Sequence, residues 1–196
     1  MADVRRVLIV GACMLALQAC LPLDQHAVFD YSPHVSPPVT VVLARLGVSS
    51  FHDLRPDEDR ESTKSLGSIE EMIAVKVAAD LGSSGLFAGV DYPAEPERDI
   101  FLLEGEILRF SWDWSCSSAW WVGGCNIKKD AGHVKFHVRM IHWPTRRILV
   151  DYTKESDVAM HKYYIFDDRG EELGMAFRNV VSFIKEAMIE DAPSWP

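Results

Sequence analysis

Residues 101–114 read Phe-Leu-Leu-Glu-Gly-Glu-Ile-Leu-Arg-Phe-Ser-Trp-Asp-Trp, and this stretch decides the fold. In its first half, apolar residues alternate with Glu104 and Glu106, which predicts a strand with one buried and one polar face. From Leu108 onward, the apolar residues occupy the opposite parity. A one-residue slip turns every later side chain to the other face of a sheet. The sequence therefore predicts either a β-bulge near residues 107–109 or a distal half that is covered on its other face.

Other parts of the chain have the same strand character. Residues 131–142 alternate apolar and charged side chains, which is typical of a half-buried strand. Residues 148–154 continue this pattern after a turn at residues 144–147, so the two stretches are expected to form a hairpin. The remaining strands are expected at two apolar and β-branched stretches, residues 39–46 and 86–90.

Two helices complete the expected elements. Ser68, followed three residues later by Glu71, is typical of a capping box at the start of a helix. A terminal helix is predicted over residues 171–188, and the charged stretch 53–61 is expected to be a loop. The order β-α-β-β-β-β-α predicts an α+β fold, with a mixed or mostly antiparallel sheet and two helices packed on one face.

Three phrases in this order resemble a known family. They are Phe51-His-Asp-Leu-Arg-Pro56, Ser84-Gly-Leu-Phe87 and Leu103-Glu-Gly-Glu-Ile107. Together they are similar to small bacterial envelope lipoproteins related to the TolB N-terminal domain and the curli-secretion lipoprotein. The resemblance covers residues 39–109. It implies an accessory part of an envelope assembly or transport machine, and it transfers no catalytic residue to this chain.

The N-terminus is consistent with that family. Arg5 and Arg6 precede an uncharged apolar stretch over residues 7–19, which has the length of a signal peptide. Leu17-Gln-Ala-Cys20 resembles the bacterial lipobox, in which the cysteine receives lipid and becomes the first residue after cleavage. An uncleaved apolar anchor and an ordinary signal peptide are the alternatives.

The chain is accordingly expected to have three parts. Residues 1–19 are the signal peptide, residues 20–38 are the palmitate-bearing cysteine and a proline-rich extended tether, and residues 39–196 are a single domain. Because Leu21 follows the lipidated cysteine, the lipoprotein resemblance implies sorting to the periplasmic face of the outer membrane.

Two cysteines remain after the signal and the lipid site are assigned. Because an exported protein meets an oxidising compartment, Cys116 and Cys125 are expected to form one disulfide. Two reduced thiols are the alternative. The disulfide would close an aromatic hairpin loop.

This loop region is also rich in tryptophan. Four of the six tryptophans fall within ten residues. Adjacent tryptophans on a strand or turn point to opposite sides, so they cannot all enter one core. Partner binding is therefore expected at Trp112, Trp114, Trp120 and Trp121, with core packing and contact with membrane or glycan as alternatives.

The remaining patterns argue against several function classes. The formal charge of −9 becomes −10 after removal of residues 1–19, which hold two arginines and one aspartate, and such acidity disfavours nucleic acid. No nucleophile or phosphate-loop motif occurs, and no cofactor is expected. His133 and His137 are interleaved with cations, so they indicate a polar sheet face opposite Glu104 and Glu106 and no metal site.

These observations favour a non-catalytic, lipid-anchored envelope protein. It would dock to another envelope protein or assemble with its own copies, and the membrane would be contacted through the lipid. The alternative is a periplasmic carrier of a hydrophobic or glycan ligand, held at the tryptophan-rich loop. An enzyme is a third hypothesis, with no catalytic residue to support it.

Overall fold

The computed structural model describes residues 29, 31, 42–95, 97–119, 124–160 and 171–195, with the backbone alone at 114–119, 124–130 and 160. Within these residues the chain forms a six-stranded sheet with helices packed on it, which confirms a mixed α+β fold. The signal peptide, Cys20 and most of the expected tether lie outside the described residues.

The sheet is mixed, as expected. Its strand order is β3-β1-β4-β5-β6, and β2 lies beside β4 off this path. β1 runs parallel to β3 and β4, and β2 runs parallel to β4, whereas β4, β5 and β6 are antiparallel. The strands are β1 (Val42–Val48), β2 (His52–Asp53), β3 (Phe87–Asp91), β4 (Phe101–Ala119), β5 (Gly124–His142) and β6 (Arg147–Met160).

The helices differ in part from the expectation. The described residues contain three α-helices, α2 (Asp57–Ser62), α3 (Ile69–Ser83) and α4 (Glu171–Asp191), where two were predicted. α2 lies in the charged stretch that was expected to be a loop. Its first turn carries Asp57, Glu58 and Asp59, and acidic side chains stabilise the N-terminus of a helix through the helix dipole. α3 begins after Ser68, yet that side chain makes no cap hydrogen bond, so the predicted capping box is wrong. Short 3₁₀ turns occupy Lys64–Leu66 (η1) and Ala192–Ser194 (η2).

The predicted bulge is confirmed in β4. Ile107 lies opposite Phe136 and Arg109 opposite Lys135, so Leu108 is the extra residue on its strand. Before the bulge Ile107 is buried, and after it Phe110 is buried on the same side of the sheet. The insertion of one residue therefore keeps both halves of the strand facing the core.

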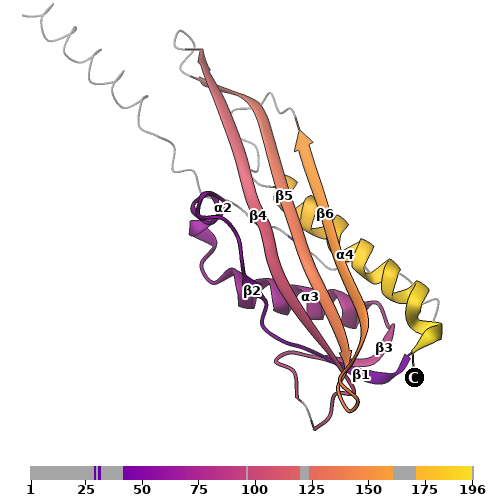
Figure 1. The fold of residues 1–196 in the computed structure, drawn as a ribbon. Coiled ribbons are helices and arrows are strands. Elements are labelled where there is room, and N and C mark those ends of the chain that lie inside the picture. The colour runs from indigo at the N-terminus through magenta and orange to yellow at the C-terminus, as the bar shows by residue number, and fades with distance from the viewer. Residues whose placement is uncertain are drawn as a thin grey trace, which may run out of the picture.

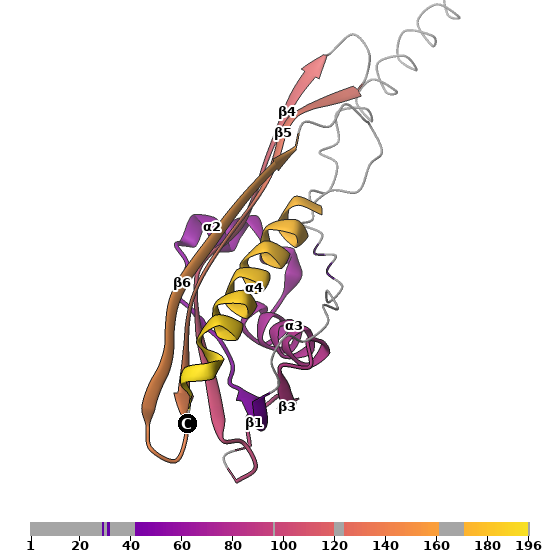
Figure 2. The same ribbon diagram turned by 90° about the vertical axis from the view of Figure 1, so that its right-hand side faces the viewer.

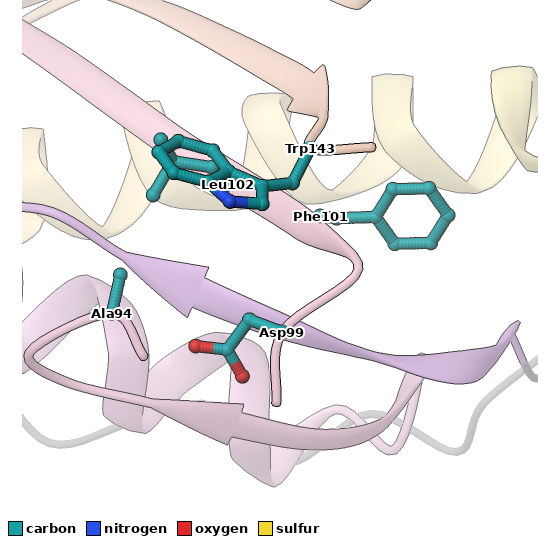
Figure 3. Close-up of a pocket in the computed structure, with 5 residues that line it drawn as sticks. All are labelled: Ala94, Asp99, Phe101, Leu102 and Trp143. Carbon is teal, nitrogen blue, oxygen red and sulfur yellow. The ribbon is translucent and has the colours of Figure 1, made fainter. Parts of the chain in front are cut away.

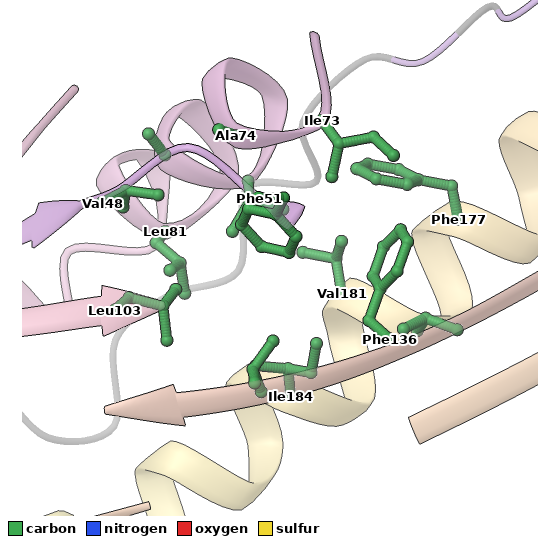
Figure 4. Close-up of a cluster of buried hydrophobic side chains, with 14 of the residues drawn as sticks. Val48, Phe51, Ile73, Ala74, Leu81, Leu103, Phe136, Phe177, Val181 and Ile184 are labelled. Carbon is green, nitrogen blue, oxygen red and sulfur yellow. The ribbon is translucent and has the colours of Figure 1, made fainter. Parts of the chain in front are cut away.

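The core lies between the sheet and the helices α3 and α4 (Figures 1, 2 and 4). Phe51, Phe136 and Phe177 meet there, with the Phe136 and Phe177 ring centroids 5.8 Å apart in an edge-to-face arrangement. Gly105 allows this packing, because a Cβ atom at that position would lie 2.2 Å from the Phe51 ring.

The segment after β1 covers one edge of β4. Leu54 donates its backbone N–H to the carbonyl of Ile107 at 3.0 Å, beyond the point where β2 pairs with the strand. Arg55 Nη1 then donates to the carbonyl of Phe110 at 2.9 Å. Ser62 Oγ in α2 accepts from the backbone N–H of Trp112 at 3.2 Å. The edge of β4 is thus occupied as far as Trp112.

Two residues of the expected tether contact the domain. Tyr31 is buried and Phe29 is half-buried against the core between α3 and α4. At these positions the chain is not simply a spacer, because both rings pack on Phe177.

Candidate functional site

The β4–β5 hairpin extends beyond the rest of the sheet (Figures 1 and 2). The pairing of β5 with β6 ends at Asp130 opposite Met160, while β4 and β5 continue to pair from Ser115 opposite Lys129 to Ala119 opposite Gly124. Five residues of β4 at 3.3–3.4 Å each give this two-stranded extension a length of about 17 Å. We call residues 115–119 and 124–129 the ribbon.

The ribbon has free edges in the described structure. The segment that covers β4 makes its last contact at Trp112, and β6 ends one residue before the ribbon begins on β5. Figures 1 and 2 show both strands running past the ends of α3 and α4. Two-stranded hairpins are marginally stable in water, and strand edges offer unpaired N–H and C=O groups. The ribbon is therefore the part of the sheet best placed to meet a partner.

The described residues of the predicted aromatic site, Trp112 and Trp114, lie in β4 before the ribbon. Trp112 is buried at 5% exposure and belongs to the core, so its assignment to partner binding is wrong. Trp114 lies in β4 opposite Asp130, just before the ribbon. Trp120 and Trp121 lie outside the described residues.

The predicted disulfide also falls on the ribbon. Cys116 lies opposite Ile127, and Cys125 lies opposite Ser118, so the two cysteines are offset by two positions in the register. Strand structure continues past both cysteines, to Ala119 and from Gly124, where a longer loop was expected. The described structure places the residues near each other and leaves the disulfide a prediction.

A second candidate is the outer face, the side of β4–β5–β6 that points away from α3 and α4. The central strand β5 carries cations, and the flanking strands carry carboxylates. Lys135 Nζ lies 2.8 Å from Glu155, and Arg139 Nη2 lies 3.6 Å from Glu104. This arrangement confirms the expected polar face opposite the glutamates of β4.

His137 is held between two carboxylates on that face. Its Nδ1 lies 2.9 Å from Glu106 Oε2 on β4, and its Nε2 lies 2.8 Å from Asp151 Oδ1 on β6. Hydrogen bonding to Asp151, and then to Glu106, raises the pKa of His137 above its usual value. A neutral imidazole donates from only one nitrogen, so both contacts are satisfied only in the charged form.

His133 repeats the arrangement four residues earlier. Its Nε2 lies 3.1 Å from Asp113 Oδ2 on β4, and its Nδ1 contacts Asp157 on β6. Arg109 Nη1 also approaches Asp157, at 3.5 Å. Each histidine therefore connects all three antiparallel strands.

A polar hollow of about 210 Å³ opens on the outer face. It is lined by His52, Glu104, Gly105, Glu106, His137 and Arg139. Among the described side chains, no group of three His, Cys, Asp or Glu is placed to hold a metal ion. Chemically, the hollow offers charges of both signs to a small polar group.

A second hollow lies where β4 begins (Figure 3). Its volume of about 10 Å³ corresponds to one water molecule. It is lined by Ala94, Asp99, Phe101, Leu102 and Trp143. Burial raises the pKa of Asp99, whereas the hydrogen bond from Arg45 lowers the pKa of the neighbouring Asp91. The size of this hollow suits a structural water better than a ligand.

None of the helices in the described part of the chain is both long and apolar enough to cross a bilayer.

Comparison with known proteins relates the chain to others through its fold. No family model and no curated protein matches the sequence. Among solved structures, it is similar to protein XCC0632 of Xanthomonas campestris, of the DUF330 family, with a TM-score of 0.51 and 12% identity. That match covers 86% of this chain and 96% of the other. At this identity the likeness supports the fold alone.

Two further solved structures match with lower scores. Lipoprotein GNA1162 of Neisseria meningitidis gives a TM-score of 0.36 at 14% identity, over 73% of this chain and 99% of that one. TolB of Acinetobacter baumannii gives 0.33 at 12% identity, over 83% of this chain and 31% of that one. Both scores are too low to argue from.

Proposed function

We propose that this chain is a non-catalytic, lipid-anchored protein of the bacterial envelope that docks to another envelope protein, or to further copies of itself, through the ribbon. The observation that carries the proposal is the extension of β4 and β5 beyond β6 and beyond the segment covering the edge of β4. A pair of strands with free edges is an interaction element in many proteins, since a partner strand can complete its hydrogen bonds.

The anchor is proposed from the sequence. Cys20 closes a lipobox-like phrase after a signal-length apolar stretch, and Leu21 suits sorting to the outer membrane. Because one acyl chain gives only marginal attachment, stable anchoring needs more than one chain on this cysteine. Changing Cys20 to Ala should abolish palmitate labelling and processing. Labelling that survives this change would remove the anchor from the proposal.

The non-catalytic part is also a proposal. It is supported by a sequence without a nucleophile motif and by an outer face whose histidines are each engaged by two carboxylates. The acidic charge favours a protein partner over nucleic acid. The carrier alternative is less well supported, because the larger described hollow is lined mainly by charged and polar side chains.

A double change of Trp120 and Trp121 to Ala tests the docking site. Changing Trp143 to Ala, at the opposite end of β5, is the matched control. We expect the double variant to lose most cross-linked partner in a pulldown from envelope membranes while its melting temperature stays near that of the original protein. Undiminished pulldown with unchanged melting would contradict docking through the hairpin end. A large loss of melting temperature would instead assign these tryptophans to the core.

A further inference from the structure

Phe29 and Tyr31 lie in an aromatic groove between α3 and α4. The Phe29 ring meets Phe110 and Phe177 edge to face, with centroids 5.3 and 5.1 Å apart. Tyr31 meets the same Phe177 ring at 4.7 Å and is only 6% exposed. Two rings separated by one residue thus insert between sheet and helices.

The groove also contains two polar side chains, Asp80 and Lys185, beside the Tyr31 hydroxyl. The Tyr31 hydroxyl donates a hydrogen bond to Asp80 of α3, a carboxylate that is itself buried. Asp80 accepts a second hydrogen bond from Lys185 Nζ of α4 at 3.0 Å. Tyr31 therefore joins a buried ion pair that connects the two helices, and burial followed by the Asp80 contact raises the pKa of its phenol.

Cations lie over the two rings. Lys76 Nζ is 5.1 Å from the centroid of Phe29 and 5.8 Å from that of Tyr31. Arg178 Cζ is 5.9 Å from the centroid of Tyr31. All three distances suit a cation–π contact. The groove therefore recognises an aromatic-x-tyrosine segment through packing, one hydrogen bond and charge.

The contacts described for Phe29 and Tyr31 are mainly those of their side chains. Both residues lie outside the strands and helices, and the carbonyl of Tyr31 accepts a long 3.5 Å contact from Lys76 Nζ. Side-chain attachment can be undone without breaking the sheet, whereas a paired strand cannot leave so simply.

We propose that Phe29 and Tyr31 form a latch that docks the N-terminal segment in the α3–α4 groove and so sets how far the domain stands from the membrane. The proposal rests on lipidation of Cys20 from the proposed function. Nine residue steps from Cys20 to Phe29 span at most about 30 Å, whereas the 22 steps to Val42 span about 75 Å. Docking at Phe29 therefore leaves a tether with less than half of the maximum length that is available up to Val42, and release lengthens the tether.

Changing both Phe29 and Tyr31 to Ala tests the latch in the full lipidated chain on a supported phosphatidylethanolamine–phosphatidylglycerol bilayer. Changing Phe183 to Ala, an exposed phenylalanine on α4, is the matched control. We expect proteinase K to cut within residues 21–41 at least tenfold faster in the double variant than in the original protein or the control. Neutron reflectometry should place the protein layer of the double variant farther from the lipid.

A milder variant separates release from unfolding. Tyr31→Phe keeps the ring and removes the hydrogen bond to Asp80, so a several-fold faster cleavage is expected with the domain still folded. Equal cleavage rates and equal layer height in the original protein and both latch variants would overturn the proposal. An intact mass without lipid on Cys20 would instead refute the anchor, and the cleavage rates would still report whether the latch exists.

Discussion

His137 is a residue whose charge state the fold controls. Its two nitrogens face Glu106 and Asp151, and these hydrogen bonds raise its pKa in the folded chain. In the unfolded chain the pKa of a histidine is about 6.5. Because the folded value is the higher one, the stabilisation is full below about pH 6.5 and is lost as pH rises through the folded pKa.

Changing His137 to Gln should therefore flatten the pH dependence of stability. We expect the melting temperature of the original protein to fall more between pH 6 and pH 9 than that of the variant. His142→Gln is the control, since its ring contacts the uncharged Thr145. His52, Glu104 and Arg139 line the same hollow, and all three proteins keep these residues. Parallel melting curves for all three proteins would refute the role of His137.

Arg55 shows how one buried cation holds several elements. It is 6% exposed, pairs with Asp53 through Nε at 2.8 Å and Nη2 at 2.9 Å, and donates to Thr63 and to the carbonyl of Phe110. The hydrogen bonds from Arg55 hold the pKa of Asp53 below its usual range.

Changing Arg55 to Ala should leave that carboxylate and carbonyl without their main donor. Breaking a buried ion pair from one side costs about 3–5 kcal/mol, so we expect a loss of about 3 kcal/mol in the free energy of unfolding by urea. The exposed pair of Arg98 with Glu95 supplies the control, where Arg98→Ala should cost about 0.5 kcal/mol. Similar losses of unfolding free energy in the two variants would show that the buried contacts of Arg55 stabilise the fold no more than an exposed ion pair does.

Among the secondary-structure elements, the bulge in β4 can be tested by comparing two single-residue deletions. Leu108 has no opposite residue, so its deletion leaves every other pair of β4 and β5 in place. Deletion of Ser111 instead reverses the facing of the later residues of β4, so that Trp112 turns toward the outer face and Asp113 toward the core. We expect the Leu108 deletion to melt cooperatively and the Ser111 deletion to lose its folded circular-dichroism signal. Loss of folding in both deletions would mean that the bulge itself is required.

The predicted disulfide can be tested at the same scale. In the observed register Cys116 and Cys125 are diagonal neighbours, which places their Cα atoms about 7–8 Å apart, whereas disulfides usually need less than about 7 Å. Formation of the bond therefore should shift the end of the ribbon. Peptide mapping of the non-reduced protein should give one cross-linked peptide. Two separately alkylated cysteines would contradict the pairing.

The sequence predicted those elements whose residues follow a clear period. The bulge could be predicted because two regular alternations in β4 meet at one extra residue, and α4 because its apolar residues recur on one face. α2 and β2 were missed because they are short and are fixed by contacts made elsewhere, chiefly those of Arg55 with the edge of β4.

The candidate site was predictable only in part. The alternation of β5 indicated a polar face, but the pairing of each histidine with two carboxylates depends on the register of three strands. Trp112 was misassigned because its burial depends on the bulge before it. Phe29 and Tyr31 gave no periodic signal, since single residues in a proline-rich stretch carry no period.

In the molecule as a whole, the proposed N-terminal latch and the proposed docking site lie at different places along the long strands β4 and β5. α3, α4 and the docked N-terminal residues gather on one side of the sheet, and the ribbon extends past them (Figure 2). In the described part of the chain no strand pairs with the outer edge of β6. This edge is a poor site for pairing with a second copy, because Asp151, Glu155 and Asp157 would bring like charges together. Docking is therefore expected at the ribbon.

Site-specific photo-cross-linking in intact cells tests whether the protein docks through the ribbon. A photoreactive residue would replace Ser117 in the ribbon or, as the control, Thr153 on the outer face of β6. We expect a discrete cross-linked product from position 117 and little or none from position 153. Products from position 153 alone, or equal products from both positions, would contradict docking through the ribbon.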